Sequence, residues 1–182
     1  MSAGFAAPVC GMTWGWVGTR GTWATPEAES SMRATADTNV TWAAIAYASV
    51  QATPFDTEIP FSEAPTVTDA EIVWAFREAK SSGMRVCLKP VVNCADGSWR
   101  AHIGFLWPDV PGEPTWDEWF ASYRAFILHA ARLAAAEDCE MLCVGCEMVR
   151  ADAQDAQDVS LALLGWHEPL DVIGEEQQAH LV

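Results

Sequence analysis

The segment MRVCLKPVV (Met84 to Val92) is almost continuously apolar and interrupted only by Arg85 and Lys89. Such a run is typical of a strand buried on both faces, as in a parallel sheet covered by helices. Apolar residues at helical spacing precede it, and a loop rich in Trp, Asp, Asn and Gly follows it. This stretch therefore predicts a β/α protein built around a parallel sheet.

The same alternation recurs along the chain. The first strand pattern ends near Trp14, and three others span residues 39–49, 84–92 and 140–146. Helices are predicted between them, from about 26 to 38, 69 to 82 and 116 to 136. Their start signals are an N-cap with a first-turn proline at 25–26 and capping boxes at 68–71 and 115–118.

The loops after the strands are long and polar, whereas the loops after the helices are short. That asymmetry is typical of barrels and doubly wound sheets, whose ligands bind beyond the carboxyl ends of the strands. GMTWGWVG (Gly11 to Gly18) lacks the G-x-G-x-x-G pattern of dinucleotide-binding folds, so a nucleotide-binding sheet is the weaker alternative. An eight-unit barrel takes about 250 residues. Because the sequence up to Glu147 contains patterns for four strands, it predicts either half a barrel or another fold.

Composition limits the classes of function. The chain has 182 residues, ten of them Trp, and a net charge of −15. Its acidity argues against nucleic-acid and membrane partners. A neutral sugar suits it, since indole faces stack on sugar rings. No secretory start and no apolar run of ~18 residues is seen. We therefore expect a cytoplasmic protein with reduced thiols and no metal or cofactor. The sequence leaves its oligomeric state open.

EMLCVGCEMVR (Glu140 to Arg150) can be interpreted in two ways. With Cys139 it contains C-x₃-C-x₂-C, which suggests a metal or iron–sulfur site. On a strand spanning 140–146, however, Cys143 and Cys146 would point to opposite faces and could not bind one ion. The other interpretation is a buried strand that delivers Glu147 to a site, where a carboxyl beside apolar neighbours suits a general acid. A structural alternative remains, in which Glu147 pairs with Arg150 or Lys89.

Several phrases together resemble glycoside hydrolase family 113: GMTWGW, VCLKPVVNCADGSWRAHI, PTWDEWFASYRAFILHAA and MLCVGCEM. The resemblance covers residues 9 to 150. It implies a (β/α)₈ TIM-barrel glycosidase of clan A, here in about its first four β/α units. Such enzymes are retaining and include β-mannanases, with close relatives labelled 1,4-β-xylanases.

The resemblance also implies roles for individual residues. In clan A a Glu after the fourth strand is the general acid/base, and it corresponds to Glu147; the nucleophile follows the seventh strand. The residues expected at the sugar-binding face are Trp14, Trp16, Lys89, Asn93 and Trp99, with His102 and Trp107 as more remote candidates. The Lys-Pro-His pattern of the family appears here as Lys89-Pro90-Val91.

Residues 1–158 are accordingly predicted to be the N-terminal half of the barrel, and 159–182 a divergent tail without the expected fifth strand, for which we hypothesise a frameshift or truncation. No second carboxylate is found at barrel spacing. The leading hypothesis is a retaining endo-β-mannanase- or xylanase-like hydrolase, inactive in this form because it lacks the nucleophile. The alternatives are a non-catalytic carbohydrate-binding or scaffold protein and a metal-dependent enzyme.

Overall fold

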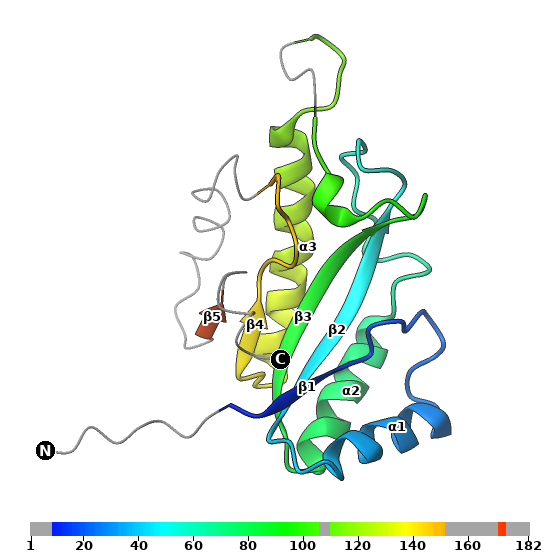
Figure 1. The fold of residues 1–182 in the computed structure, drawn as a ribbon, viewed down its shortest axis with the longest axis vertical. Helices are drawn as coiled ribbons and strands as arrows, with labels where there is room; N and C mark the ends of the chain where they lie inside the picture. The colour runs from blue at the N-terminus through cyan, green and yellow to red at the C-terminus, as the bar shows by residue number, and fades with distance from the viewer. Residues whose placement is uncertain (1–8, 106–109, 152–170, 174–182) are drawn as a thin grey trace, which may run out of the picture.

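The computed structural model describes residues 9–105, 110–151 and 171–173. Five strands form one parallel sheet in chain order, β1-β2-β3-β4-β5. Figure 1 shows β2 and β3 as the long central strands. The strands are β1 (Gly11–Trp14), β2 (Trp42–Gln51), β3 (Arg85–Cys94), β4 (Met141–Cys143) and β5 (Asp171–Ile173).

The helices begin where the capping signals predicted. They are α1 (Pro26–Ala36), α2 (Asp69–Ser81) and α3 (Trp116–Ala136), with a 3₁₀ turn η1 (Arg100–His102) after β3. The Thr25 hydroxyl accepts from the Ala28 amide at the start of α1. Both predicted capping boxes form, at Thr68 and at Thr115. Three helix starts were therefore readable from local sequence alone.

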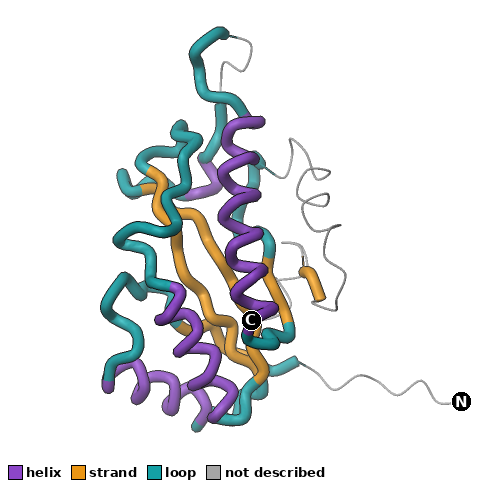
Figure 2. The backbone as a smooth tube through the Cα atoms, turned by 180° about the vertical axis from the view of Figure 1, so that it is seen from behind, coloured by secondary structure: helices purple, strands orange, loops and turns teal. Residues whose placement is uncertain are grey.

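The helices cover one face of the sheet, as the view from behind shows (Figure 2). The main core lies between them and the sheet and contains Ile45, Leu88, Phe76 and Phe126. A smaller apolar cluster of Cys87, Met141 and Cys143 lies on the opposite face, against Trp42 and Ala44. Alternate residues of each strand thus pack on opposite sides, as a strand with two buried faces requires. The second face corresponds to the interior of a barrel.

Two predicted features of the C-terminal region differ in the structure. The fourth strand was expected to run from 140 to 146, but regular pairing ends at Cys143. A fifth strand was not expected, yet residues 171–173 pair in parallel with 141–143. Three residues are too short a run for the strand periodicity to be recognised in the sequence. The other residues of the predicted tail and Trp107 lie outside the described residues.

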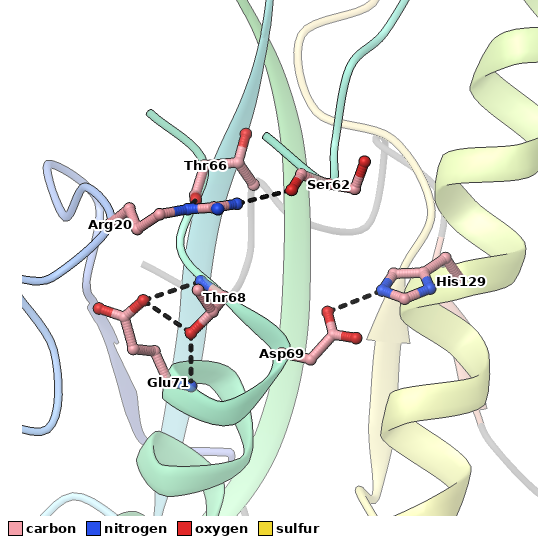
Figure 3. Close-up of polar contacts among 7 residues, drawn as sticks. All are labelled: Arg20, Ser62, Thr66, Thr68, Asp69, Glu71 and His129. Atoms are coloured by element: carbon pink, nitrogen blue, oxygen red, sulfur yellow. Dashed lines mark hydrogen bonds and ion pairs between the residues drawn. The ribbon is translucent and has the colours of Figure 1, made fainter. Parts of the chain in front are cut away.

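A polar network fixes the long loops before α1 and α2 (Figure 3). The buried Glu71 carboxylate accepts from the amides of Gly21, Trp23 and Thr68 at 2.8, 3.2 and 2.8 Å. Arg20 donates to the carbonyls of Thr66 and Ser62 at 3.0 and 2.7 Å. Arg20 thereby satisfies carbonyls of the loop before α2, and Glu71 of α2 satisfies amides of both loops.

A second contact in the same region joins two helices. His129 of α3 contacts the Asp69 carboxylate at the start of α2, with 2.8 Å between Nε2 and Oδ1. Together with the Glu71 network, this contact connects α2 to elements on both sides of it. No described helix is long and apolar enough to cross a membrane.

Replacing Glu71 tests how much this network stabilises the fold. We expect Glu71→Ala to lower the free energy of unfolding by about 2–3 kcal/mol, because it leaves loop amides without an acceptor. Glu118→Ala is the matched control: Glu118 has the same place in a capping box, but among the described residues it accepts from Thr115 alone. We expect it to cost about 1 kcal/mol. Urea unfolding measures both, and equal losses would contradict the account.

The same variant should change the dependence of stability on pH. Burial raises the pKa of the Glu71 carboxyl, but hydrogen bonds from Thr68, Gly21 and Trp23 outweigh burial and bring the pKa below its usual 4.5. A carboxyl of lowered pKa stabilises the fold above its unfolded pKa, and this contribution is lost as the pH falls through the folded pKa. Below pH 4.5 the native protein should therefore lose more stability than Glu71→Ala. Parallel curves would show that Glu71 does not contribute.

Candidate active site

Glu147 lies beyond the carboxyl end of β4. Its φ is 57°, in the left-handed region that costs a residue with a side chain about 1–2 kcal/mol. Its side chain is 49% exposed. Strained backbone of this kind occurs often at functional sites, where surrounding contacts hold it in place. The contacts of its carboxylate are therefore informative.

Two donors meet the same oxygen of this carboxylate. The indole Nε1 of Trp99 donates to Oε2 of Glu147 at 2.7 Å. Nη1 of Arg100 also donates to Oε2, as an ion pair. Among the hydrogen bonds between described residues, none reaches Oε1 of Glu147. One oxygen is thus fixed by the protein, and the other is available to a ligand.

Arg100 is buried to 7% exposure and uses its guanidinium in several directions. Its Nε donates to the Val92 carbonyl at 3.1 Å, and its Nη2 donates to Oδ1 of Asn93 at 2.6 Å. The guanidinium lies 4.9 Å from the ring centroid of Trp16, a cation–π contact. Arg100 therefore connects the ends of β1, β3 and β4.

The two indoles at this site remain accessible. Trp16 is 43% exposed and Trp99 is 52% exposed. Trp99 meets the His102 ring edge-on at 5.7 Å between centroids. Large exposed aromatic surfaces beside a polar centre are suited to a ligand with both apolar and hydroxyl groups.

The structure gathers three of the five predicted binding residues around Glu147: Trp16 and Asn93 through Arg100, and Trp99 directly. Lys89 lies near them, since its positive charge acts to lower the pKa of the thiol of Cys146, the residue before Glu147. Trp14 is elsewhere: it is buried on the helix-covered face, where its Nε1 donates to Ser31 Oγ at 3.0 Å. Trp14 does not reach the cluster because it pairs in register with Ile45, which faces the helices.

The predicted surroundings of Glu147 were wrong in two respects. Its neighbours are an arginine and an indole N–H rather than apolar side chains. Its ion-pair partner is Arg100, not Arg150 or Lys89. Sequence reasoning missed Arg100, although it directly follows Trp99 in a chain with only 10 basic residues. A cation in a loop after a buried strand was the signal available.

The positions predicted for two cysteines also differ from those in the structure. Cys143 and Cys146 were placed on opposite faces because the strand was expected to continue through 146. Pairing ends at Cys143, so the two-residue alternation does not extend to Cys146, whose thiol lies near enough to Lys89, on the interior face, for that charge to act on its pKa. Even so, no group of three or more His, Cys, Asp or Glu side chains within the described ranges is arranged to hold a metal ion.

This combination defines a class of protein. A parallel β/α sheet, helices on one face, and a half-exposed glutamate with two indoles beyond the carboxyl ends of the strands make up the N-terminal part of a β/α-barrel glycoside hydrolase. The chain belongs to glycoside hydrolase family 113, whose model matches residues 12–162. That match extends past the predicted domain boundary at 158.

Solved structures agree on the fold. A GH113 β-1,4-mannanase is 38% identical, with a TM-score of 0.86 over 92% of this chain and 55% of its own. A complex of a GH113 β-1,4-mannanase is 36% identical, with a TM-score of 0.87 over 96% and 59%. The GH113 β-mannanase AaManA from Alicyclobacillus acidocaldarius, in complex with ManMIm, is 38% identical, with a TM-score of 0.85 over 92% and 54%.

The chain thus spans between half and three fifths of the length of these relatives. The predicted barrel class is confirmed. No curated protein matches the chain.

Thiol labelling tests the placement of the cysteines. Of the six, Cys10 is exposed and the other five are buried. Burial raises the pKa of Cys87 to about 12 and that of Cys94 to about 11, so little reactive thiolate forms there. We expect iodoacetamide at about pH 8 to modify one thiol rapidly in the native protein and six in denaturant. The control variant Cys10→Ser should remove the rapid phase. Rapid labelling of several native thiols would contradict this arrangement.

Proposed function

We propose that this chain carries the acid/base half of a retaining glycoside hydrolase active site that acts on β-1,4-linked mannan chains. The observation that carries the proposal is the Glu147 carboxylate, which is anchored through one oxygen and half exposed beyond the carboxyl ends of the strands. Family membership and the mannanase names of the similar structures support the reaction and the sugar.

The chemistry follows from the two protonation states of Glu147. As a carboxylic acid it would protonate the glycosidic oxygen as that bond breaks. As a carboxylate it would then take a proton from the water that releases the sugar. The exposed indoles of Trp16 and Trp99 beside it offer faces for sugar rings. Lys89 and Asn93 would supply polar contacts to hydroxyl groups.

A retaining mechanism needs a second carboxylate about 5 Å from the first, as the nucleophile. In the proposal it comes from a strand beyond those described, because the chain spans little more than half of its relatives. Hydrolysis is therefore proposed for Glu147 in the complete barrel. Mannan takes precedence over xylan, because each similar structure is named a mannanase.

A second candidate is sugar binding without hydrolysis. It is favoured by the complete engagement of Oε2 and by the gathering of both indoles within the described half. Titration with mannotetraose, followed by tryptophan fluorescence, tests binding by this chain. Trp99→Ala should weaken the response. Trp74→Phe, which alters a tryptophan packed in the helix-covered core, should not.

Substitution of Glu147 tests the catalytic proposal in a chain that contains the whole barrel. Glu147→Gln removes the proton donor and should lower mannan hydrolysis by about 10²–10⁴-fold. The loss should be smaller for an aryl mannoside whose leaving group needs no proton. Glu140→Gln is the matched control, since within the described part of the chain its carboxylate accepts from the Val86 amide alone, at the opposite end of β4. Full activity of Glu147→Gln on mannan would refute the role.

A further inference from the structure

The two oxygens of the Glu147 carboxylate have different surroundings. Both protein donors, Trp99 Nε1 and Arg100 Nη1, meet Oε2. Neither donor reaches Oε1, and the side chain is half exposed. A carboxyl group held through a single oxygen can gain or lose a proton at the other one without breaking the contacts that hold it.

Arg100 is itself held firmly. Its Nε donates to the Val92 carbonyl and its Nη2 donates to Asn93, so the guanidinium has fixed directions. The Trp16 ring covers it at 4.9 Å. A planar guanidinium with this many partners has little rotational freedom, and a lysine could not reproduce its fork of donors.

The backbone at Glu147 gives a second, independent observation. Its left-handed φ of 57° is unfavourable for a glutamate, so the local chain does not select this position by itself. The contacts of the side chain with Arg100 and Trp99 oppose that preference. They fix the carboxylate relative to β3, since Arg100 is anchored to the carboxyl end of that strand.

We propose that Arg100 is a positioning residue which, together with Trp99, holds Oε2 of Glu147 and leaves Oε1 to exchange the proton with the glycosidic oxygen and then with water. This inference rests on the proposed acid/base role of Glu147. In the first step the proton leaves Oε1 for the leaving oxygen as its bond to the anomeric carbon breaks and the second carboxylate, supplied by the complete barrel, bonds to that carbon. In the second step water bonds to the anomeric carbon, the second carboxylate leaves it, and Oε1 takes the proton of the water. Oε2 stays bound throughout.

The indole N–H of Trp99 reports on this arrangement without any need for activity. In this chain labelled with ¹⁵N-tryptophan, ten indole signals are expected, and Trp99→Phe identifies the one of interest. Glu147→Gly removes the carboxylate while accepting the left-handed backbone, so it marks the position of a free Trp99 indole.

Arg100→Met should move the Trp99 signal at least halfway towards its position in Glu147→Gly, because the carboxylate is no longer held against the indole. Arg100→Lys should give an intermediate shift. Arg77→Met is the matched control: it removes an arginine–glutamate pair, with Glu137, at an exposed site. Its Trp99 signal should stay at the native position.

An unchanged Trp99 signal in a folded Arg100→Met protein would overturn the proposal. If that variant does not fold, Arg100→Lys decides the question, and a native Trp99 position there would overturn it equally. In the complete barrel, Arg100→Met should lower kcat about tenfold or more with little change in KM, and Arg100→Lys should restore part of it.

The two proposals can fail separately. Native hydrolysis by Glu147→Gln refutes the acid/base role, whatever the indole signal does. A rise in KM alone for Arg100→Met overturns the positioning role and leaves the acid/base role standing.

Discussion

The parallel pairing of β2 with β3 is the constraint on which the rest of the structure depends. Ten residue pairs, from Trp42–Arg85 to Gln51–Cys94, keep the two strands in register along their whole length. This ladder decides which side chains face the helices and which face the barrel interior. It also brings the carboxyl ends of both strands to the same edge. A shift of one residue would send Lys89 and Asn93 to the helix-covered face and dismantle the site.

Charge determines how the site is completed at that edge. A buried guanidinium is costly unless it is paired and hydrogen-bonded. Arg100 meets that need with Glu147, Asn93 and the Val92 carbonyl, and in doing so connects three strand ends. In a chain of net charge −15, one arginine surrounded by acceptors organises a carboxylate that would otherwise be free to move. The contacts that satisfy the buried guanidinium of Arg100 therefore also hold the carboxylate of Glu147 in place.

Local sequence was sufficient for the elements and the class of fold. The helix starts at Thr25, Thr68 and Thr115 follow from side chains that cap their own helices, so no distant contact is needed to predict them. The continuous apolar runs that predict β2 and β3 are also local features, so no distant contact was needed to recognise these strands. The strand-end position made Glu147 a candidate, and the family resemblance decided between the acid/base role and an ordinary ion-paired carboxylate.

The features that could not be predicted from the sequence depend on contacts between distant segments. Arg100 contacts Glu147, which lies 47 positions away in the sequence, and Trp16 covers Arg100 from the loop after β1. β4 pairs with β3 only as far as Leu142 and with β5 as far as Cys143. The predicted strand alternation was therefore extended too far along the chain and misplaced Cys146. The resemblance assigned Trp14 to the sugar-binding face, and an isolated tryptophan before a loop does not by itself reveal which face of the sheet it occupies.

A crystal structure with a bound β-1,4-mannooligosaccharide tests the central claim most directly, through the distance from its glycosidic oxygen to each oxygen of Glu147. We predict that sugar rings lie against Trp16 and Trp99 and that the glycosidic oxygen lies within hydrogen-bond distance of Oε1. Arg100 and Trp99 should still be bonded to Oε2. A sugar bound away from Glu147, or one that displaces Arg100 to reach Oε2, would contradict it.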